Sequence, residues 1–228
     1  KIEGQSMTWF GWTHLAGLAG IWLACLWVGR WGIRSRRTAD RFLLLNLIAY
    51  MAIAYSWRWS ELSMAICLPL LLCDFILFGA CYLLCEKRSQ TTFECIHLLS
   101  WTSSIWALIT PDLPNDFPHY RYFEFFWGHG LIFVVLAHLQ SGQSYRLTRD
   151  SWKGAACGLQ LWIVLVGLLD YAFGWNYGYL MLKPPAGSPL DYLGPWPFYI
   201  LVADALVVGL CWLVCRFFQP KTPEPILL

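Results

Sequence analysis

Seven apolar runs, separated by short polar segments, make up most of the chain. Each is about 15 to 23 residues long, and a helix rising 1.5 Å per residue needs about 20 apolar residues to cross a bilayer. We therefore predict an all-α, multi-pass integral membrane bundle of seven transmembrane helices. The second run is short and Pro69 interrupts the third, so six helices, one of them broken, stay an alternative. The predicted helices lie at about 9–28, 42–56, 62–84, 93–109, 122–139, 152–173 and 196–217.

Composition supports the membrane interpretation and excludes several other classes. Of the 228 residues, 58% are hydrophobic and 13% are charged, whereas soluble domains carry about 25% charged residues. Residues 1–6 look like a remnant of cloning, 7–217 form the single predicted bundle, and 218–228 a cytoplasmic tail. The net charge of +2 gives no reason to expect a nucleic-acid partner. No phosphate-binding glycine loop, HExxH or CxxCH motif is present.

The nine cysteines lie almost entirely within the apolar runs. We expect them to be free and to behave as small apolar residues. Their spacing matches no metal site, and we expect neither a metal nor another cofactor.

Basic residues lie mostly on one side of the predicted bundle. Twelve of the sixteen Lys and Arg follow the first, third or fifth run or flank the C-terminal end. The other side has three. By the positive-inside rule, this predicts an outer N-terminus and a cytoplasmic C-terminus in the cell membrane. The twelve are Arg30, Arg34, Arg36, Arg37, Arg41, Lys87, Arg88, Arg146, Arg149, Lys153, Arg216 and Lys221.

Ionisable residues inside the apolar runs are costly in lipid and usually face a bundle interior. Asp74 lies near the middle of the third run. His129 and Asp204 lie about 12 and 10 Å below the outer ends of theirs. Two proline-rich outer loops, 110–118 and 182–197, are expected to cap this region. The pattern predicts a polar cavity in the outer half, with polar contacts that only join helices as the alternative.

Several of these residues are candidates for chemistry. His129, between two glycines, is a candidate general base, and Asp74 either orients it or is a protonated core acid. Cys73 lies about 100° around the helix from Asp74. In contrast, His97, Glu94 and His138 lie near cytoplasmic ends, where we expect water to reach them. The substrate-binding candidates are Arg121, Glu124, Asp170, Asn176, Tyr192, Trp196 and Asp204.

Three segments carry a family resemblance. Leu68-Pro-Leu-Leu-Leu-Cys-Asp74 and Phe125-Phe-Trp-Gly-His-Gly130 resemble elements of bacterial YwaF-like integral membrane proteins, and the segment 176–197 resembles their last outer loop. That family is similar to eukaryotic transmembrane protein 164, a cysteine-dependent phospholipid acyltransferase. It is more distantly similar to the androgen-induced hydrolases of lipid esters.

The match is incomplete at the reacting residues. The family histidine falls at Leu71 and the eukaryotic cysteine at Leu70. The threonine of the hydrolases falls among residues 43–45, which are all leucine. Of the residues that the resemblance marks as reactive, His129 is retained.

Two functions follow. The first is a membrane-embedded acyltransferase or lipid-ester hydrolase, with His129 as base and Cys73 or water as nucleophile. The second is a non-catalytic protein that binds or transports a lipid or small amphiphilic ligand. Both imply membrane lipids as partners, and the sequence leaves the oligomeric state open.

Overall fold

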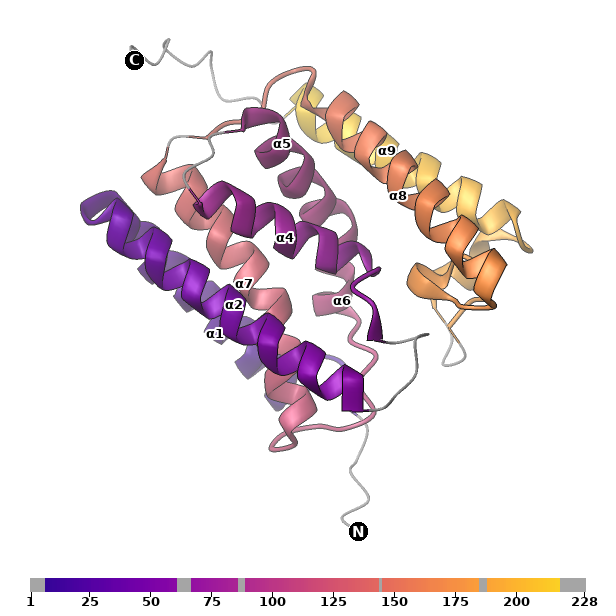
Figure 1. Cartoon of the computed structure of the whole chain (residues 1–228), viewed down its shortest axis with the longest axis horizontal. Helices are drawn as coiled ribbons and strands as arrows, with labels where there is room; N and C mark the ends of the chain where they lie inside the picture. The colour runs from indigo at the N-terminus through magenta and orange to yellow at the C-terminus, as the bar shows by residue number, and fades with distance from the viewer. Residues whose placement is uncertain (1–6, 61–66, 86–88, 144, 185–187, 218–228) are drawn as a thin grey trace.

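The computed structural model describes residues 7–60, 67–85, 89–143, 145–184 and 188–217. These residues form helices and no strands, as the sequence predicts (Figure 1). The predicted remnant at 1–6 and tail at 218–228 lie outside the described residues. The long helices are α1 (Trp12–Arg34), α2 (Arg36–Ser60), α4 (Leu72–Leu84), α5 (Gln90–Leu99), α7 (Tyr120–Gly142), α8 (Ser151–Phe173) and α9 (Phe198–Phe217).

Shorter helical turns complete the described chain. α5 continues through a π-helical turn, η1 (Ser100–Ser104), into α6 (Ile105–Ile109), so these three form one segment. Two 3-10 turns, η2 (Tyr177–Tyr179) and η3 (Pro189–Leu193), lie between α8 and α9. The seven helical segments of the described residues match the seven predicted runs. Two boundaries differ most. In the run predicted at 62–84, residues 68–71 are not helical and α4 begins only at Leu72. In the second run, α2 extends six residues further toward the N-terminus than expected.

Four helices are long and apolar enough to cross a membrane by length and composition: α1, α7, α8 and α9. α2 has the length, but three arginines and an aspartate occupy its first six residues. α4 is apolar and shorter. The helices are therefore those of a membrane protein, as composition indicates. The predicted orientation of the termini stays a prediction.

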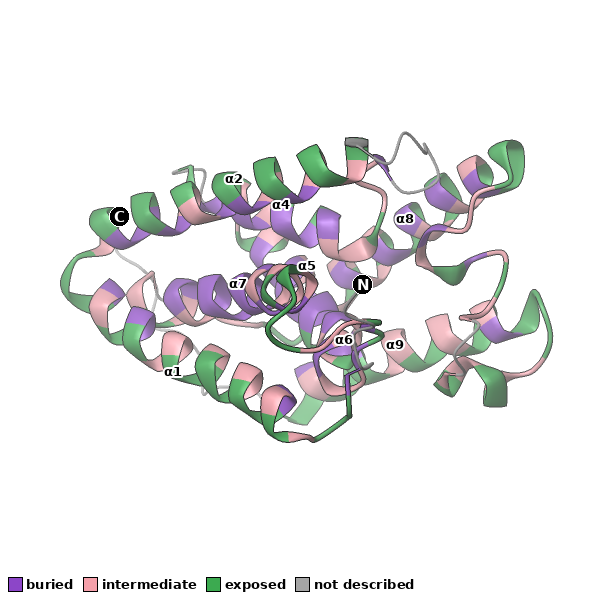
Figure 2. Cartoon of the chain, turned by 90° about the horizontal axis from the view of Figure 1, so that it is seen from below, coloured by how far each residue is buried: buried purple, intermediate pink, exposed green. Residues whose placement is uncertain are grey.

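α7 is the central helix of the group formed by α1, α2, α4 and α7. It is buried over most of its length, whereas α1 and α9 expose wide green faces (Figure 2). Glycines let its neighbours approach closely: a Cβ on Gly128 would lie 2.2 Å from the Tyr50 hydroxyl. α1, α2 and α4 all pack against α7.

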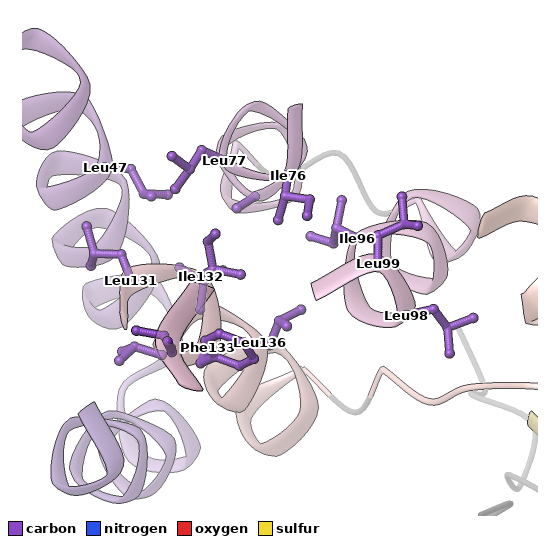
Figure 3. Close-up of a cluster of buried hydrophobic side chains, with 14 of the residues drawn as sticks. Leu47, Ile76, Leu77, Ile96, Leu98, Leu99, Leu131, Ile132, Phe133 and Leu136 are labelled. Carbon is purple, nitrogen blue, oxygen red and sulfur yellow. The ribbon is translucent and has the colours of Figure 1, made fainter. Parts of the chain in front are cut away.

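Branched aliphatic side chains fill the space between these helices. Leu47 of α2, Ile76 and Leu77 of α4, and Ile132 and Leu136 of α7 belong to one buried cluster (Figure 3). The cluster continues onto α5. Each of these five side chains exposes 2% or less of its surface, so the cluster fixes how α2, α4, α5 and α7 sit relative to one another.

α8 and α9 run beside each other at one side of the molecule, where α8 packs on α5 (Figure 1). Two hydrogen bonds join this pair to the segment that precedes α4. The Trp162 indole donates to the Leu70 carbonyl at 3.0 Å, and the Leu68 amide donates to the Tyr177 hydroxyl at 3.0 Å. Tyr177 lies in η2, so the loop after α8 helps to hold the start of α4.

One expectation about the basic end is wrong. We predicted that water reaches His97, Glu94 and His138. All three are instead buried, and His138 exposes none of its surface. His138 Nε2 lies 2.6 Å from Asp40 Oδ1, which also accepts a hydrogen bond from Gln143. The predicted second helix begins only at residue 42, so Asp40 fell in a loop and was not expected to be the partner of His138.

Candidate functional site

Asp74 lies at the third residue of α4 and is 3% exposed. Its Oδ2 accepts a hydrogen bond from the Leu71 amide at 3.1 Å, so the carboxylate caps the helix that carries it. Its Oδ1 accepts from the Tyr55 hydroxyl at 3.1 Å. The first bond follows from where α4 begins, whereas the second is a contact between α2 and α4. They leave the carboxylate oriented toward α2.

Arg58 supplies the opposite charge. It lies in the last turn of α2, and its Nη1 is 3.4 Å from each carboxylate oxygen of Asp74. The guanidinium also lies over the Tyr55 ring, 5.2 Å from its centre. Arg58 and Tyr55 were not among the predicted site residues. Their three-residue spacing on a helix, which puts both on one face, is the signal that could have found them.

A groove of about 460 Å³ opens between α2 and the start of α4. Its wall is apolar apart from the Tyr55 hydroxyl, which binds Asp74, and the Cys67 thiol, which donates to the Arg58 carbonyl at 3.0 Å. This differs from the expected polar cavity in the outer half. The lining residues are Ile48, Met51, Ala52, Tyr55, Trp59, Cys67, Leu68, Pro69 and Phe78.

His129 faces the same region from α7. Its Nδ1 lies 3.0 Å from the Phe125 carbonyl oxygen. A carbonyl can only accept, so Nδ1 carries the proton, and in the neutral ring the Nε2 lone pair is left to act as an acceptor or base. Asp74, Arg58 and Glu124 are all near enough to act electrostatically on the imidazole. Asp74 is nevertheless hydrogen-bonded to Arg58, Tyr55 and the Leu71 amide, and none of its described hydrogen bonds is to His129.

Cys73 points toward η1. Its Sγ lies 3.4 Å from the Ser104 hydroxyl, on the α5–η1–α6 segment. It is not among the residues that line the groove. Cys73 and Asp74 are neighbours in the sequence, but their side chains have different partners: Cys73 contacts Ser104, and Asp74 contacts Arg58 and Tyr55. All nine cysteines are free, as predicted.

Arg121 and Glu124 form an ion pair on the first turns of α7, with 3.2 Å between Nη1 and Oε2. The Arg121 guanidinium lies 5.9 Å from the ring centre of Trp57 on α2. These contacts join the ends of α2 and α7 beside the Arg58–Asp74 pair. Two of the seven substrate-binding candidates, Arg121 and Glu124, thus lie close to the Arg58–Asp74 ion pair.

The other five candidates lie on α8, α9 or the loop between them. Asp204 accepts a hydrogen bond from Gln160 at 2.6 Å, joining α9 to α8. Asp170 is fully buried at the end of α8. The Asn176 side chain binds backbone groups of Met181 and Leu182, so its polar atoms hold the loop together.

Two aromatic candidates complete this second group. The Trp196 indole donates to the Leu180 carbonyl at 3.0 Å, and Tyr192 is 91% exposed. None of the five makes a described hydrogen bond or ion pair to Asp74, Arg58 or His129. Among the residues that the structure describes, no group of three or more His, Cys, Asp or Glu is placed to hold a metal ion.

Comparison with protein families gives one match, to the TMEM164 family over residues 7–215. The chain belongs to the TMEM164 family. The match includes every helix that contributes to the site and nearly all of α9, so the resemblance to transmembrane protein 164 is confirmed for the whole bundle. No curated protein and no solved structure matches the chain. This TMEM164-family protein is a membrane protein, and the Arg58–Asp74 ion pair lies beside the groove between α2 and α4.

Proposed function

We propose that this TMEM164-family chain binds a lipid ester in the groove between α2 and α4 and cleaves or transfers its acyl chain. The observation that carries the proposal is the composition of the groove. Its wall is apolar from Ile48 to Trp59, about 16 Å along α2, and Tyr55 in that wall hydrogen-bonds to the paired Asp74. An acyl chain fits the apolar part, which brings the ester near Tyr55 and Arg58.

His129 supports an acyl-transfer reaction because its Nε2 has no hydrogen-bond partner among the described residues and can accept a proton. In that reaction a hydroxyl of water or of an acceptor alcohol loses its proton to Nε2, and its oxygen attacks the ester carbonyl carbon. Arg58 is the nearest cation for the oxyanion that forms. The carbon–oxygen bond to the leaving alcohol then breaks, and the proton passes from Nε2 to that alcohol. Cys73 is less suited as nucleophile because its thiol is engaged with Ser104.

The motifs at 68–74 and 125–130 support the same chemistry, since they resemble segments of YwaF-like membrane proteins, a family that is similar to a lipid acyltransferase, and since His129 is retained. The groove and His129 both come from these motifs or from helices packed on them. The structure adds Tyr55 and Arg58, neither of which belongs to these two motifs.

Lipid-ester turnover by the purified protein in mixed micelles tests the proposal. His129→Asn keeps a donor for the Phe125 carbonyl but removes the base, so it should fold normally and lose at least 100-fold in rate, the scale of general-base catalysis. His119→Ala, in an exposed loop, is the control and should retain activity. Unchanged turnover in His129→Asn would sink the enzymatic proposal.

A second candidate, binding without turnover, is favoured by one observation. Cys73 and His129 are both outside the groove lining, so a lipid can occupy the groove without touching either. Under this alternative, the wild-type protein retains a lipid that mass spectrometry finds unmodified, and His129→Asn retains the same lipid in the same amount.

A further inference from the structure

The turn between α1 and α2 carries four exposed arginines. Arg30 and Arg34 lie in the last turns of α1, Arg37 and Arg41 lie in the first turns of α2, and all four are exposed. Only Ser35 separates the two helices. We name these four residues the arginine turn. Because all four lie within residues 30–41, where α1 ends and α2 begins, their positive charges gather at one end of the molecule.

The nearest carboxylate does not neutralise them. Asp40 accepts from His138 and Gln143 through Oδ1, and its Oδ2 lies 3.7 Å from Arg36. Among the ion pairs of the described residues, none includes a member of the arginine turn. Asp40 is therefore bound to His138, Gln143 and Arg36, and the four guanidinium groups of the arginine turn stay exposed.

Aromatic side chains lie beside the arginine turn. Trp27 stacks on Trp31 with 5.4 Å between ring centres, and Trp31 meets the edge of Phe42 at 5.4 Å. At 100° per residue, Trp27, Trp31, Arg30 and Arg34 occupy one arc of about 100° on α1. Trp27 is 59% exposed. The same face of α1 thus presents indole rings next to guanidinium groups.

We propose that the arginine turn binds the headgroup of an anionic phospholipid. Arginine forks match phosphate oxygens with two parallel hydrogen bonds, and tryptophan prefers the depth where headgroups meet acyl chains. A soluble anion would use the charges but not the indoles, so the aromatic face favours a lipid. This site is separate from the groove, because none of the four arginines lines the groove and Arg41 lies about 10 Å along α2 from Ile48, the first residue of the groove wall.

Native mass spectrometry of the full chain in neutral detergent tests this inference. The protein is mixed with equal amounts of dioleoyl phosphatidylglycerol and dioleoyl phosphatidylcholine, and the retained lipids are counted. The wild type should retain phosphatidylglycerol preferentially. Arg34→Gln with Arg37→Gln should reduce that preference on the order of tenfold, since each basic residue near an anionic surface contributes to binding.

Arg149→Gln with Lys153→Gln is the matched control. It removes the same charge from exposed residues near the start of α8 and should leave the preference unchanged. Three results overturn the inference: an unchanged preference in the first double variant, an equal loss in the control, or displacement of phosphatidylglycerol by inorganic phosphate at millimolar concentration. The last result would assign the turn to a soluble anion. Size-exclusion profiles confirm that both variants are folded.

Discussion

The guanidinium of Arg58 lies 3.4 Å from both carboxylate oxygens of Asp74. This contact joins the last turn of α2 to the first turn of α4, beside the apolar groove. The Asp74 side chain is 4% exposed and the Arg58 side chain 17% exposed, so the pair is largely removed from water. Removing one charge should therefore leave the other without adequate solvation.

Asp74→Asn should destabilise the protein by roughly 2–3 kcal/mol. Breaking a fully buried ion pair costs about 3–5 kcal/mol, and the remaining exposure of Arg58 lowers that figure. Unfolding in detergent, followed by circular dichroism, measures the change. Asp150→Asn removes an exposed pair with Lys153 and should shift stability by less than about 0.5 kcal/mol. Equal stability of Asp74→Asn and the wild type would contradict the structural role of the pair.

Filling the groove should prevent lipid binding while the protein stays folded. Ala52 is an exposed residue in the groove wall, so Ala52→Trp adds volume in the groove without overpacking the core. Retained lipid, measured by native mass spectrometry, should fall several-fold, and turnover should fall with it.

Ala205→Trp is the matched control for the groove. It makes the same substitution at an exposed position of α9, away from the groove wall. Its lipid content and turnover should equal those of the wild type. If Ala52→Trp behaves like Ala205→Trp, the lipid occupies another surface.

The seven helical segments could be predicted because apolar runs are recognisable in the sequence, and isolated ionisable residues within those runs marked Asp74 and His129 as candidates. The partners of those residues could not be predicted. Arg58 lies 16 positions before Asp74, and only the packing of α2 on α4 brings them together. Hydropathy also placed the start of α2 near residue 42, because the first turns are polar. Asp40 was consequently taken for a loop residue, although it binds a histidine 98 positions later.

The expected polar cavity depended on treating the mid-run Asp74 and the outer-half acids as one group. The fold divides them instead. Asp74 and Glu124 lie among α2, α4 and α7, whereas Asp204 binds Gln160 between α8 and α9. Sequence spacing within a helix predicts depth, but it does not predict which helices are neighbours.

Asp40→Asn should lower stability without affecting lipid turnover by the folded protein. The substitution weakens acceptor contacts to His138, Gln143 and Arg36, each typical charge-assisted bond contributing about 1.5–3 kcal/mol. We expect a total loss on the order of 2 kcal/mol, because the amide keeps one acceptor oxygen. Thermal melts and specific activity of the monodisperse fraction check the two parts. A loss of activity per folded molecule would mean that this end is coupled to His129.

Two glycines of α1 should respond to alanine in opposite directions. A Cβ on Gly32 would lie 2.1 Å from His138 Nδ1, and the imidazole cannot move away without losing Asp40. Gly32→Ala should therefore cost about 1–3 kcal/mol through overpacking. A Cβ on Gly20 meets nothing within 4 Å, so Gly20→Ala should stabilise the helix by up to about 1 kcal/mol.

Combining Gly32→Ala with Asp40→Asn locates the cause of the loss. If the alanine acts by displacing the imidazole from Asp40, the two changes share one interaction, and their costs should add to less than the sum. Melts of the two single variants and the double variant in the same detergent measure the difference. Fully additive costs would show that Gly32 matters for helix contact alone. If Gly20→Ala destabilises the protein as much as Gly32→Ala does, the loss in Gly32→Ala does not come from the close approach of Gly32 to His138.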